Sequence, residues 1–193
     1  MKIWQYKTRS DLSQIGNKGA SAIEFAIILP ILVLMVFGAI DFGRLFHARL
    51  ILTNLAREGA SIASREMSLA SGAYSASGLV TMLQASSSPL DMSANGKIYI
   101  WKIVAGKSED EREPTASKSA EAGSLNVLST IKNDPGVRLG LNQNVYDQLV
   151  YDDAENKKAA SISQIAVVEV FYEYRPITPL IMSNMVLSSR AVF

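Results

Sequence analysis

One carboxylate, Glu24, lies at the beginning of an apolar run that continues to Ile40 in this 193-residue chain. From Ala20 to Ile40 the run has 21 residues and contains no other charge. A carboxylate at membrane depth costs roughly a few kcal/mol unless it is paired, hydrated or close to the interface. Glu24 therefore needs a partner, and charge pairing is the chemistry that its position predicts. The alternative is a first-turn residue that favours the positive end of a helix and faces the headgroups.

The remaining candidate residues offer little catalytic or metal chemistry. The chain has one histidine, His47, and no cysteine, which excludes disulfides, thiolate metal sites and multi-histidine sites. His47 follows the apolar run, where a solvated or headgroup-facing role is expected. An acidic trio, Asp152, Asp153 and Glu155, lacks the glycine and the spacing of a calcium loop, although its cation binding stays open. Apart from that open question we expect no metal site, and we expect no enzymatic activity and no cofactor.

The charge balance argues against nucleic acid as a partner. Nineteen Lys and Arg residues stand against eighteen Asp and Glu residues, and the formal net charge is +1. No global basic field therefore exists to attract a polyanion. A hydrophobic content of 48% predicts a folded domain, and the length leaves room for an additional segment.

The apolar run is long enough to cross a membrane, because about 20 apolar residues span the hydrocarbon layer as a helix. A cleaved secretory signal has a shorter apolar part, about 7 to 15 residues, and a small-residue cleavage site. The sequence after Ile40, DFGRLFHARL, has no such site. Pro30 predicts a mild kink that a membrane helix tolerates. Four cations and one acid precede the run and predict a cytoplasmic N-terminus: Lys2, Lys7, Arg9 and Lys18, with Asp11.

The residues around Glu24 have the order of a processing site. A basic leader ends at Gly19, Ala20 follows, and Glu24 and Phe25 open the apolar helix. This order resembles the site of type IV pilins, where a prepilin peptidase cuts after glycine and the fifth residue of the mature chain is glutamate. The resemblance implies cleavage between Gly19 and Ala20. The new ammonium group would attract the Glu24 carboxylate of the same or a neighbouring subunit.

The longer stretch from Gly19 to Ser64 resembles the N-terminal region of the TadE-like family, minor pseudopilins of the tight-adherence (Flp) pilus. Near the other end, Val167 to Leu180 is similar to the family's C-terminal strand with its tyrosines and prolines. The related TadF and TadG groups share the N-terminal pattern, and the length favours TadE or TadF. The elements that carry the N-terminal resemblance are Glu24-Phe25, Pro30, Phe37-Gly38, Asp41-Phe42-Gly43-Arg44, Asn54 and Ala56-Arg57-Glu58-Gly59-Ala60.

The resemblance implies a function in pilus assembly. The chain is expected to be a minor pseudopilin of the bacterial inner membrane with a periplasmic C-terminal domain, acting in pilus initiation or incorporated in the pilus. The implied partners are the prepilin peptidase, other pilins and pseudopilins, inner-membrane platform proteins and membrane lipid. The alternative function is an unprocessed, single-pass scaffold or sensor module.

A helical pattern continues beyond the apolar run. Apolar or small residues recur at intervals of three and four, which predicts one continuous helix with a transmembrane part at 20–40 and an extension at 41–65. With Phe25 and Pro30, the residues Leu52, Leu55 and Gly59 are candidates for helix packing in assembly, and the same stripe also suits a domain core. The stripe consists of Leu45, Ala48, Leu52, Leu55, Gly59 and Ile62.

The remainder of the chain, 66–193, predicts a small α+β domain, and residues 1–19 form the leader. Strands are expected at Lys97–Val104, which follows the turn dipeptide Asn95-Gly96, at the alternating segment Gln164–Tyr174 and at Met185–Phe193. Short helices are expected near 79–85 and 142–151. The segment 106–123 is charged and lacks periodicity, which predicts a mobile surface loop. The predicted architecture is pilin-like: a long N-terminal helix packed on a small antiparallel sheet.

Overall fold

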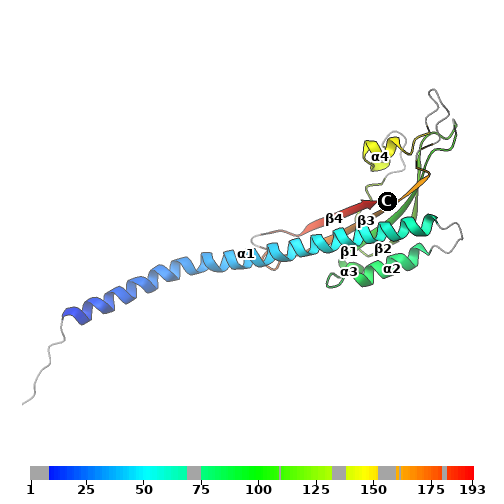
Figure 1. The fold of residues 1–193 in the computed structure, drawn as a ribbon. Coiled ribbons are helices and arrows are strands. Elements are labelled where there is room, and N and C mark those ends of the chain that lie inside the picture. The colour runs from blue at the N-terminus through cyan, green and yellow to red at the C-terminus, as the bar shows by residue number, and fades with distance from the viewer. Residues whose placement is uncertain are drawn as a thin grey trace, which may run out of the picture.

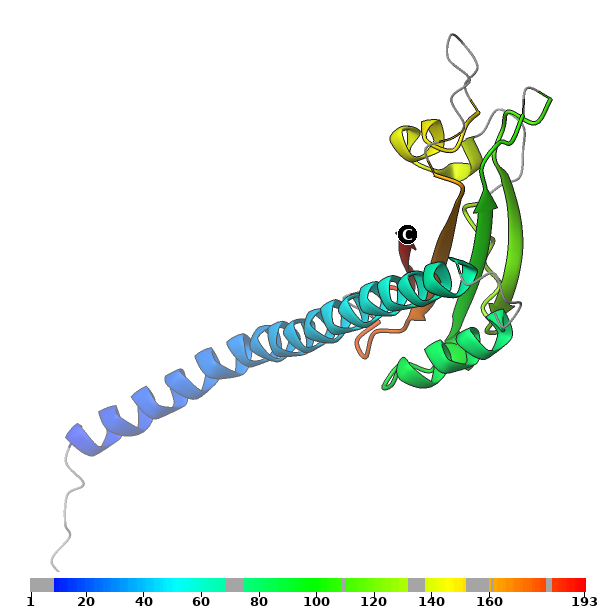
Figure 2. The same cartoon turned by 45° about the vertical axis from the view of Figure 1, so that its right-hand side comes forward.

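The computed structural model describes residues 9–68, 75–108, 110–131, 138–151, 160, 162–179 and 182–193. One long helix, α1 (Arg9–Ser68), joins a domain built on a four-stranded sheet (Figure 1). The N-terminal part of α1 extends away from the domain, whereas its C-terminal part lies across the sheet (Figure 2). The predicted α+β class, with a long helix packed on an antiparallel sheet, is confirmed.

The helix α1 begins earlier than the pattern predicted and has 60 residues. At 1.5 Å per residue its length is about 90 Å. Pro30 lies inside it, and the helix continues on both sides although the proline removes one backbone hydrogen bond. The chain therefore presents an elongated rod attached to one domain.

The sheet has the order β2-β1-β3-β4, and every neighbouring pair is antiparallel. The predicted strands are confirmed as β1 (Gly96–Val104), β3 (Gln164–Tyr174) and β4 (Met185–Val192). β-Branched and aromatic residues dominate β1 and β3, as a buried pleated surface requires. The long strand β3 pairs on both edges and carries side chains into both faces of the sheet.

The predicted loop over 106–123 is wrong for its second half, because Thr115–Ala122 forms the edge strand β2. Its apolar residues are alanines, which give a weak sequence signal. A bulge opposite Ile100 and Trp101 also breaks the alternation: Ala120 pairs with Ile100 and Lys118 with Trp101, so that Ser119 is the additional residue. Consequently Ala116 packs in one core and Ala120 against the other.

Short helices precede the first strand and lie between β2 and β3. The predicted helix near 79–85 is α2 (Ala76–Ser86), whose first turn is capped by Ser75, and α3 (Met92–Asn95) follows it. The predicted helix near 142–151 is shorter in the structure, α4 (Gln143–Asp147), and comes after the 3₁₀ turn η1 (Arg138–Gly140). The buried side chains of α2 pack against α1 and one face of the sheet.

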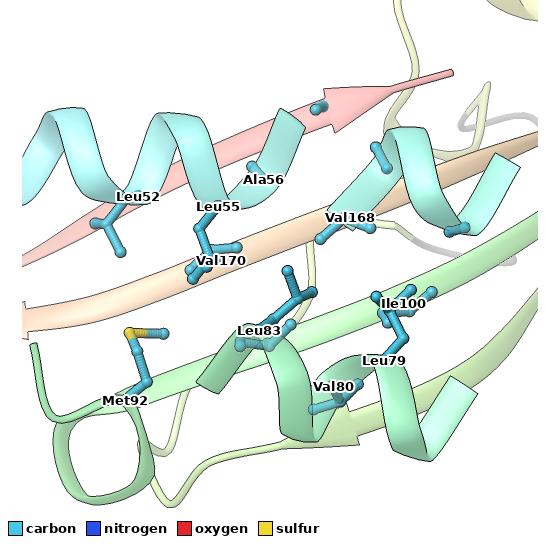
Figure 3. Close-up of a cluster of buried hydrophobic side chains, with 14 of the residues drawn as sticks. Leu52, Leu55, Ala56, Leu79, Val80, Leu83, Met92, Ile100, Val168 and Val170 are labelled. Atoms are coloured by element: carbon cyan, nitrogen blue, oxygen red, sulfur yellow. The ribbon is translucent and has the colours of Figure 1, made fainter. Parts of the chain in front are cut away.

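The main core lies between α1, α2 and one face of the sheet (Figure 3). The predicted stripe of α1 supplies its helix side: Leu52 and Leu55 are 1% and 3% exposed. Ala56 and Ala60 are fully buried, so the helix backbone comes close to its neighbours. Burying one such leucine contributes roughly 1.5–3 kcal/mol. Figure 3 shows side chains of α1, α2, β1 and β3 meeting in this core.

A second core lies on the opposite face of the sheet and contains Ile103, Leu149 and Val167. Beside it Glu169, 1% exposed, accepts hydrogen bonds from the hydroxyls of Ser129 and Thr130. The carboxylate thereby fixes the segment that precedes residue 132 on the sheet. The alternation along β3 places Glu169 on the same face as Val167, but it does not by itself predict the burial of the carboxylate.

Two of the glycines of α1, Gly59 and Gly43, give a matched test of this packing. A Cβ on Gly59 would lie 2.8 Å from Cδ1 of the buried Leu83 and 3.3 Å from Cγ1 of Val168, whereas Gly43 has no such neighbour within 4 Å. Alanine raises helix propensity at both sites. We expect Gly43→Ala to stabilise by at most about 1 kcal/mol and Gly59→Ala to destabilise by about 1 kcal/mol, because overpacking outweighs propensity.

Thermal unfolding of the detergent-solubilised chain measures both changes. Equal stabilisation by the two substitutions would show that α1 does not press against α2 at Gly59.

Candidate functional site

The N-terminal part of α1 is an apolar surface that the domain does not cover. Residues Gly19–Glu66 form a helix long and apolar enough to cross a membrane, and only 6% of its most apolar stretch is buried. The large side chains from Ile23 to Ile40 are between 42% and 67% exposed. A soluble helix would bury such a surface, so this segment suits a lipid environment or the helices of other subunits.

The predicted processing residues lie on this uncovered part of α1. Gly19, Ala20 and Glu24 are exposed, and the Gly19–Ala20 bond lies inside the helix. A Cβ placed on Gly19 would meet no atom within 4 Å beyond the helix itself. Glu24 makes no hydrogen bond or ion pair with the part of the chain that the structure describes. Its carboxylate is therefore open to a partner from outside this chain.

The five predicted packing residues divide into two groups. Phe25 is 59% exposed and Pro30 is also exposed, so both remain open to lipid or another subunit. Leu52, Leu55 and Gly59 lie in the domain's own core against α2 and β3. The second group therefore already packs against other parts of the same chain. The 22 positions from Pro30 to Leu52 separate the two groups by about 33 Å along the helix.

A second apolar stripe on α1, which the sequence analysis missed, faces away from the core. Phe42, Phe46 and Leu50 are 49%, 59% and 63% exposed. Their spacing of four residues places them along one helix face. The sequence does contain these apolar residues at positions i, i+4 and i+8. They overlap in sequence with the stripe that packs on the sheet, which we call the core stripe: Leu45, Ala48, Leu52, Leu55, Gly59 and Ile62. We refer to Phe42, Phe46 and Leu50 as the outer stripe.

The helix is attached to the end of the sheet through Asp41. This side chain is fully buried, and its carboxylate accepts hydrogen bonds from the backbone N–H groups of Ile177 at 2.8 Å and Thr178 at 2.9 Å. The Thr178 hydroxyl donates to the same carboxylate. The Tyr174 hydroxyl donates to the backbone carbonyl of Asp41 at 3.0 Å. We call this group the Asp41 clasp (Asp41, Tyr174, Ile177 and Thr178).

The clasp favours an ionised aspartate. The hydroxyl of Thr178 lowers the pKa of Asp41 most, the two backbone N–H groups and the charge of Arg44 lower it further, and burial opposes them. Burial raises the pKa of Tyr174, which therefore remains a protonated donor at neutral pH. The first acidic residue after the apolar run thus binds a turn that lies 136 residues later in the sequence.

The sequence analysis treated Asp41 only as an element of the family pattern. The available signals were a lone acid at the end of an apolar segment and a threonine between Pro176 and Pro179. Neither signal identifies the other as its partner, because hydrogen bonding over such a distance depends on the fold.

His47 lines a groove beside Arg44 at the junction of α1 and the end of β3. The predicted acidic trio, Asp152, Asp153 and Glu155, lies outside the described residues. Within the described ranges no cluster of three or more His, Cys, Asp or Glu side chains has the geometry to hold a metal ion. The chemistry that the structure displays is therefore hydrogen bonding, charge and apolar contact.

Comparison with known proteins finds a family similarity in the helix α1. The family model for TadE-like proteins matches residues 19–61. The predicted resemblance to TadE-like proteins is confirmed over this segment. The match includes Gly19, Glu24 and Asp41 but not the sheet, so the similarity of Val167 to Leu180 stays a prediction. No curated protein and no solved structure matches the chain.

Proposed function

We propose that this chain is a minor pseudopilin needed for assembly or initiation of a tight-adherence type IV pilus. The match of residues 19–61 to TadE-like proteins supports this function, because it covers the cleavage pair and Glu24. The observation that carries the proposal is the exposed apolar surface of α1, which continues from Ile23 through the outer stripe to Leu50. Such a surface serves a protein whose helix lies first in lipid and then among other helices.

The proposed mechanism begins with the helix as a membrane anchor. A prepilin peptidase cuts between Gly19 and Ala20 and removes the basic leader, whose cations would oppose extraction from the membrane. The ammonium group of a neighbouring subunit then pairs with Glu24 and fixes the relative height of the two helices. The outer stripe adds apolar contact above the bilayer, while the core stripe keeps the domain attached to its own helix.

The proposed location follows from the same elements. The helix crosses the bacterial inner membrane with its N-terminus in the cytoplasm and its domain in the periplasm, as the basic flank favours. The partners are the peptidase, other pilins and pseudopilins, platform proteins and lipid. The function is not enzymatic, and it uses neither a cofactor nor nucleic acid.

The test of processing is the intact mass and N-terminal sequence of the chain from the membranes of its native host. We expect a product that begins at Ala20. Gly19→Leu should retain the full-length precursor and reduce processing at least tenfold, because the bulky side chain occupies the site of cleavage. Gly16→Leu is the matched control, since it makes the same change three residues earlier and should be cleaved normally.

The other possible results of this experiment would each contradict a different part of the proposal. A full-length wild-type chain in membranes would support the unprocessed scaffold or sensor instead. A cut beyond Ile40 would identify a secretory signal and overturn the membrane-helix proposal. Equal precursor accumulation for Gly19→Leu and Gly16→Leu would mean that the leader, rather than the glycine, determines processing.

A further inference from the structure

A groove of about 530 Å³ lies where α1 emerges beside the end of β3. Its polar lining comes from three separate elements, α1, α3 and the end of β3 with the residue that follows it. We call it the juxtamembrane groove; its polar residues are Arg44, His47, Asn95, Tyr172, Glu173, Tyr174 and Arg175. It belongs neither to the cleavage site nor to the outer stripe.

The height of the groove coincides with the headgroup layer of a bilayer that contains residues 20–40. Arg44 lies four residues beyond Ile40, a rise of about 6 Å, and His47 lies about 10 Å beyond it. The headgroup region adds roughly 5–7 Å to each side of the hydrocarbon layer. The Arg44 backbone is therefore at the level of the headgroup layer, and the backbone of His47 lies a few ångströms outside that layer.

The groove carries hydrogen-bond donors that remain available. Arg44 and His47 are exposed and form no hydrogen bond or ion pair with any residue in the described ranges. The Tyr172 hydroxyl likewise has no hydrogen-bond partner there, and Asn95 adds a side-chain amide to the lining. A guanidinium, an imidazole and a phenol around one cavity are the groups that bind a phosphate diester.

The acidic groups near the groove are already engaged. Glu173 forms an ion pair with Arg175 at 2.6 Å. The carboxylate of Asp41 is held in the clasp, and that of Asp91 accepts from the N–H groups of Ser93 and Ala94. Their charges lower the positive potential, and the charge of Asp41 attracts Arg44, but Arg44 forms no hydrogen bond or ion pair within the described ranges. Binding should therefore depend on Arg44 more than on the number of surrounding charges.

We propose that the juxtamembrane groove binds the phosphate of a phospholipid in the leaflet next to the domain. The inference rests on the proposed membrane crossing of α1, but it does not depend on cleavage or on pilus assembly. The bound headgroup would join α1 to the end of β3 from the membrane side and thereby fix the height of the domain above the bilayer.

The experiment uses the full chain purified in a mild detergent and titrated with phosphatidylglycerol, with bound lipid counted by native mass spectrometry. Wild type should retain one phospholipid, and Arg44→Gln should weaken retention about tenfold. Arg49→Gln is the matched control, because Arg49 is an exposed cation of the same helix that does not line the groove. It should retain lipid as wild type does. Tyr172→Phe, which keeps the ring, should give a smaller loss.

The competing results are distinct. Equal losses for Arg44→Gln and Arg49→Gln would overturn the proposal in favour of diffuse attraction to the headgroups. Equal retention of diacylglycerol, which lacks the phosphate, would also overturn it. Displacement of the lipid by millimolar inorganic phosphate would identify a site for free anion instead. Release of the wild-type chain from membranes by alkaline carbonate would contradict the membrane anchor itself, a failure separate from that of the groove.

Discussion

Glu24→Gln is expected to abolish pilus assembly while cleavage after Gly19 continues. The substitution keeps the shape of the side chain and removes the charge that would pair with a neighbour's ammonium group. Two opposite charges 4 Å apart attract by about 4 kcal/mol at an effective dielectric constant of 20. We expect at least a tenfold loss of filaments sheared from the cell surface, measured by immunoblot against total cellular subunit.

Two variants separate charge pairing from general damage to the helix. Glu58→Gln makes the same change at an exposed position of the same helix and should assemble normally. Glu24→Asp keeps the charge on a shorter side chain and should restore part of the assembly. Normal filament yield from Glu24→Gln would show that this carboxylate does not set the height of neighbouring subunits.

Asp41→Ala is expected to release the turn at residues 177–178 from the helix. The substitution leaves the two backbone N–H groups and the Thr178 hydroxyl without their acceptor, and buried unsatisfied donors are costly. We expect the Tm of the solubilised chain to fall by roughly 5–10 °C. Limited proteolysis should also cut faster near residue 177. Thr178→Val should have a smaller effect, since both backbone bonds remain.

Asp110→Ala is the control for the loss of an acid, because Asp110 is exposed and lies far along the chain from the clasp. If Asp41→Ala and Asp110→Ala unfolded at the same temperature, the clasp would not stabilise the domain.

The clasp also predicts that the thermal stability of wild type and of Asp41→Asn depends differently on pH. Its hydrogen bonds hold the pKa of Asp41 below the ordinary value of 3.8, so the unfolded chain takes up this proton at a higher pH than the folded chain. The stabilisation is therefore complete well above pH 3.8 and is lost as the pH falls through the lowered value. We expect the Tm difference between wild type and Asp41→Asn to be constant near pH 7 and to shrink in acid. A constant difference down to the lowest accessible pH would exclude an ionised aspartate.

Local periodicity explains which parts of the fold the sequence could predict. The core stripe of α1 repeats at intervals of three and four residues because one helix face packs on one sheet, and Leu52 and Leu55 are buried as that pattern requires. The strand β3 has the predicted bounds because its side chains alternate between two cores. Each of these signals lies within a single element.

The features that the sequence did not reveal depend on pairing between distant segments. The strand β2 is specified by its neighbour β1, since its small alanines and its bulge leave no clear alternation of its own. Asp41 and Glu169 are buried because hydroxyl and N–H donors from other parts of the chain reach them. The same reason explains which site residues the sequence could predict. Glu24 was identified by its position at the start of the apolar run, whereas the Asp41 clasp joins distant segments and was visible only in the fold.

The separation of 136 residues between Asp41 and Ile177 also sets an order of events during biosynthesis. At about 5 to 20 residues per second, a ribosome needs roughly 7 to 27 s to travel from one partner to the other. For most of that interval the apolar helix has already been made, while β3, which covers much of its core stripe, does not yet exist. The nascent chain thus presents a finished helix before the domain that packs on it is complete, and the strands β3 and β4 are the last parts of the sheet to be made.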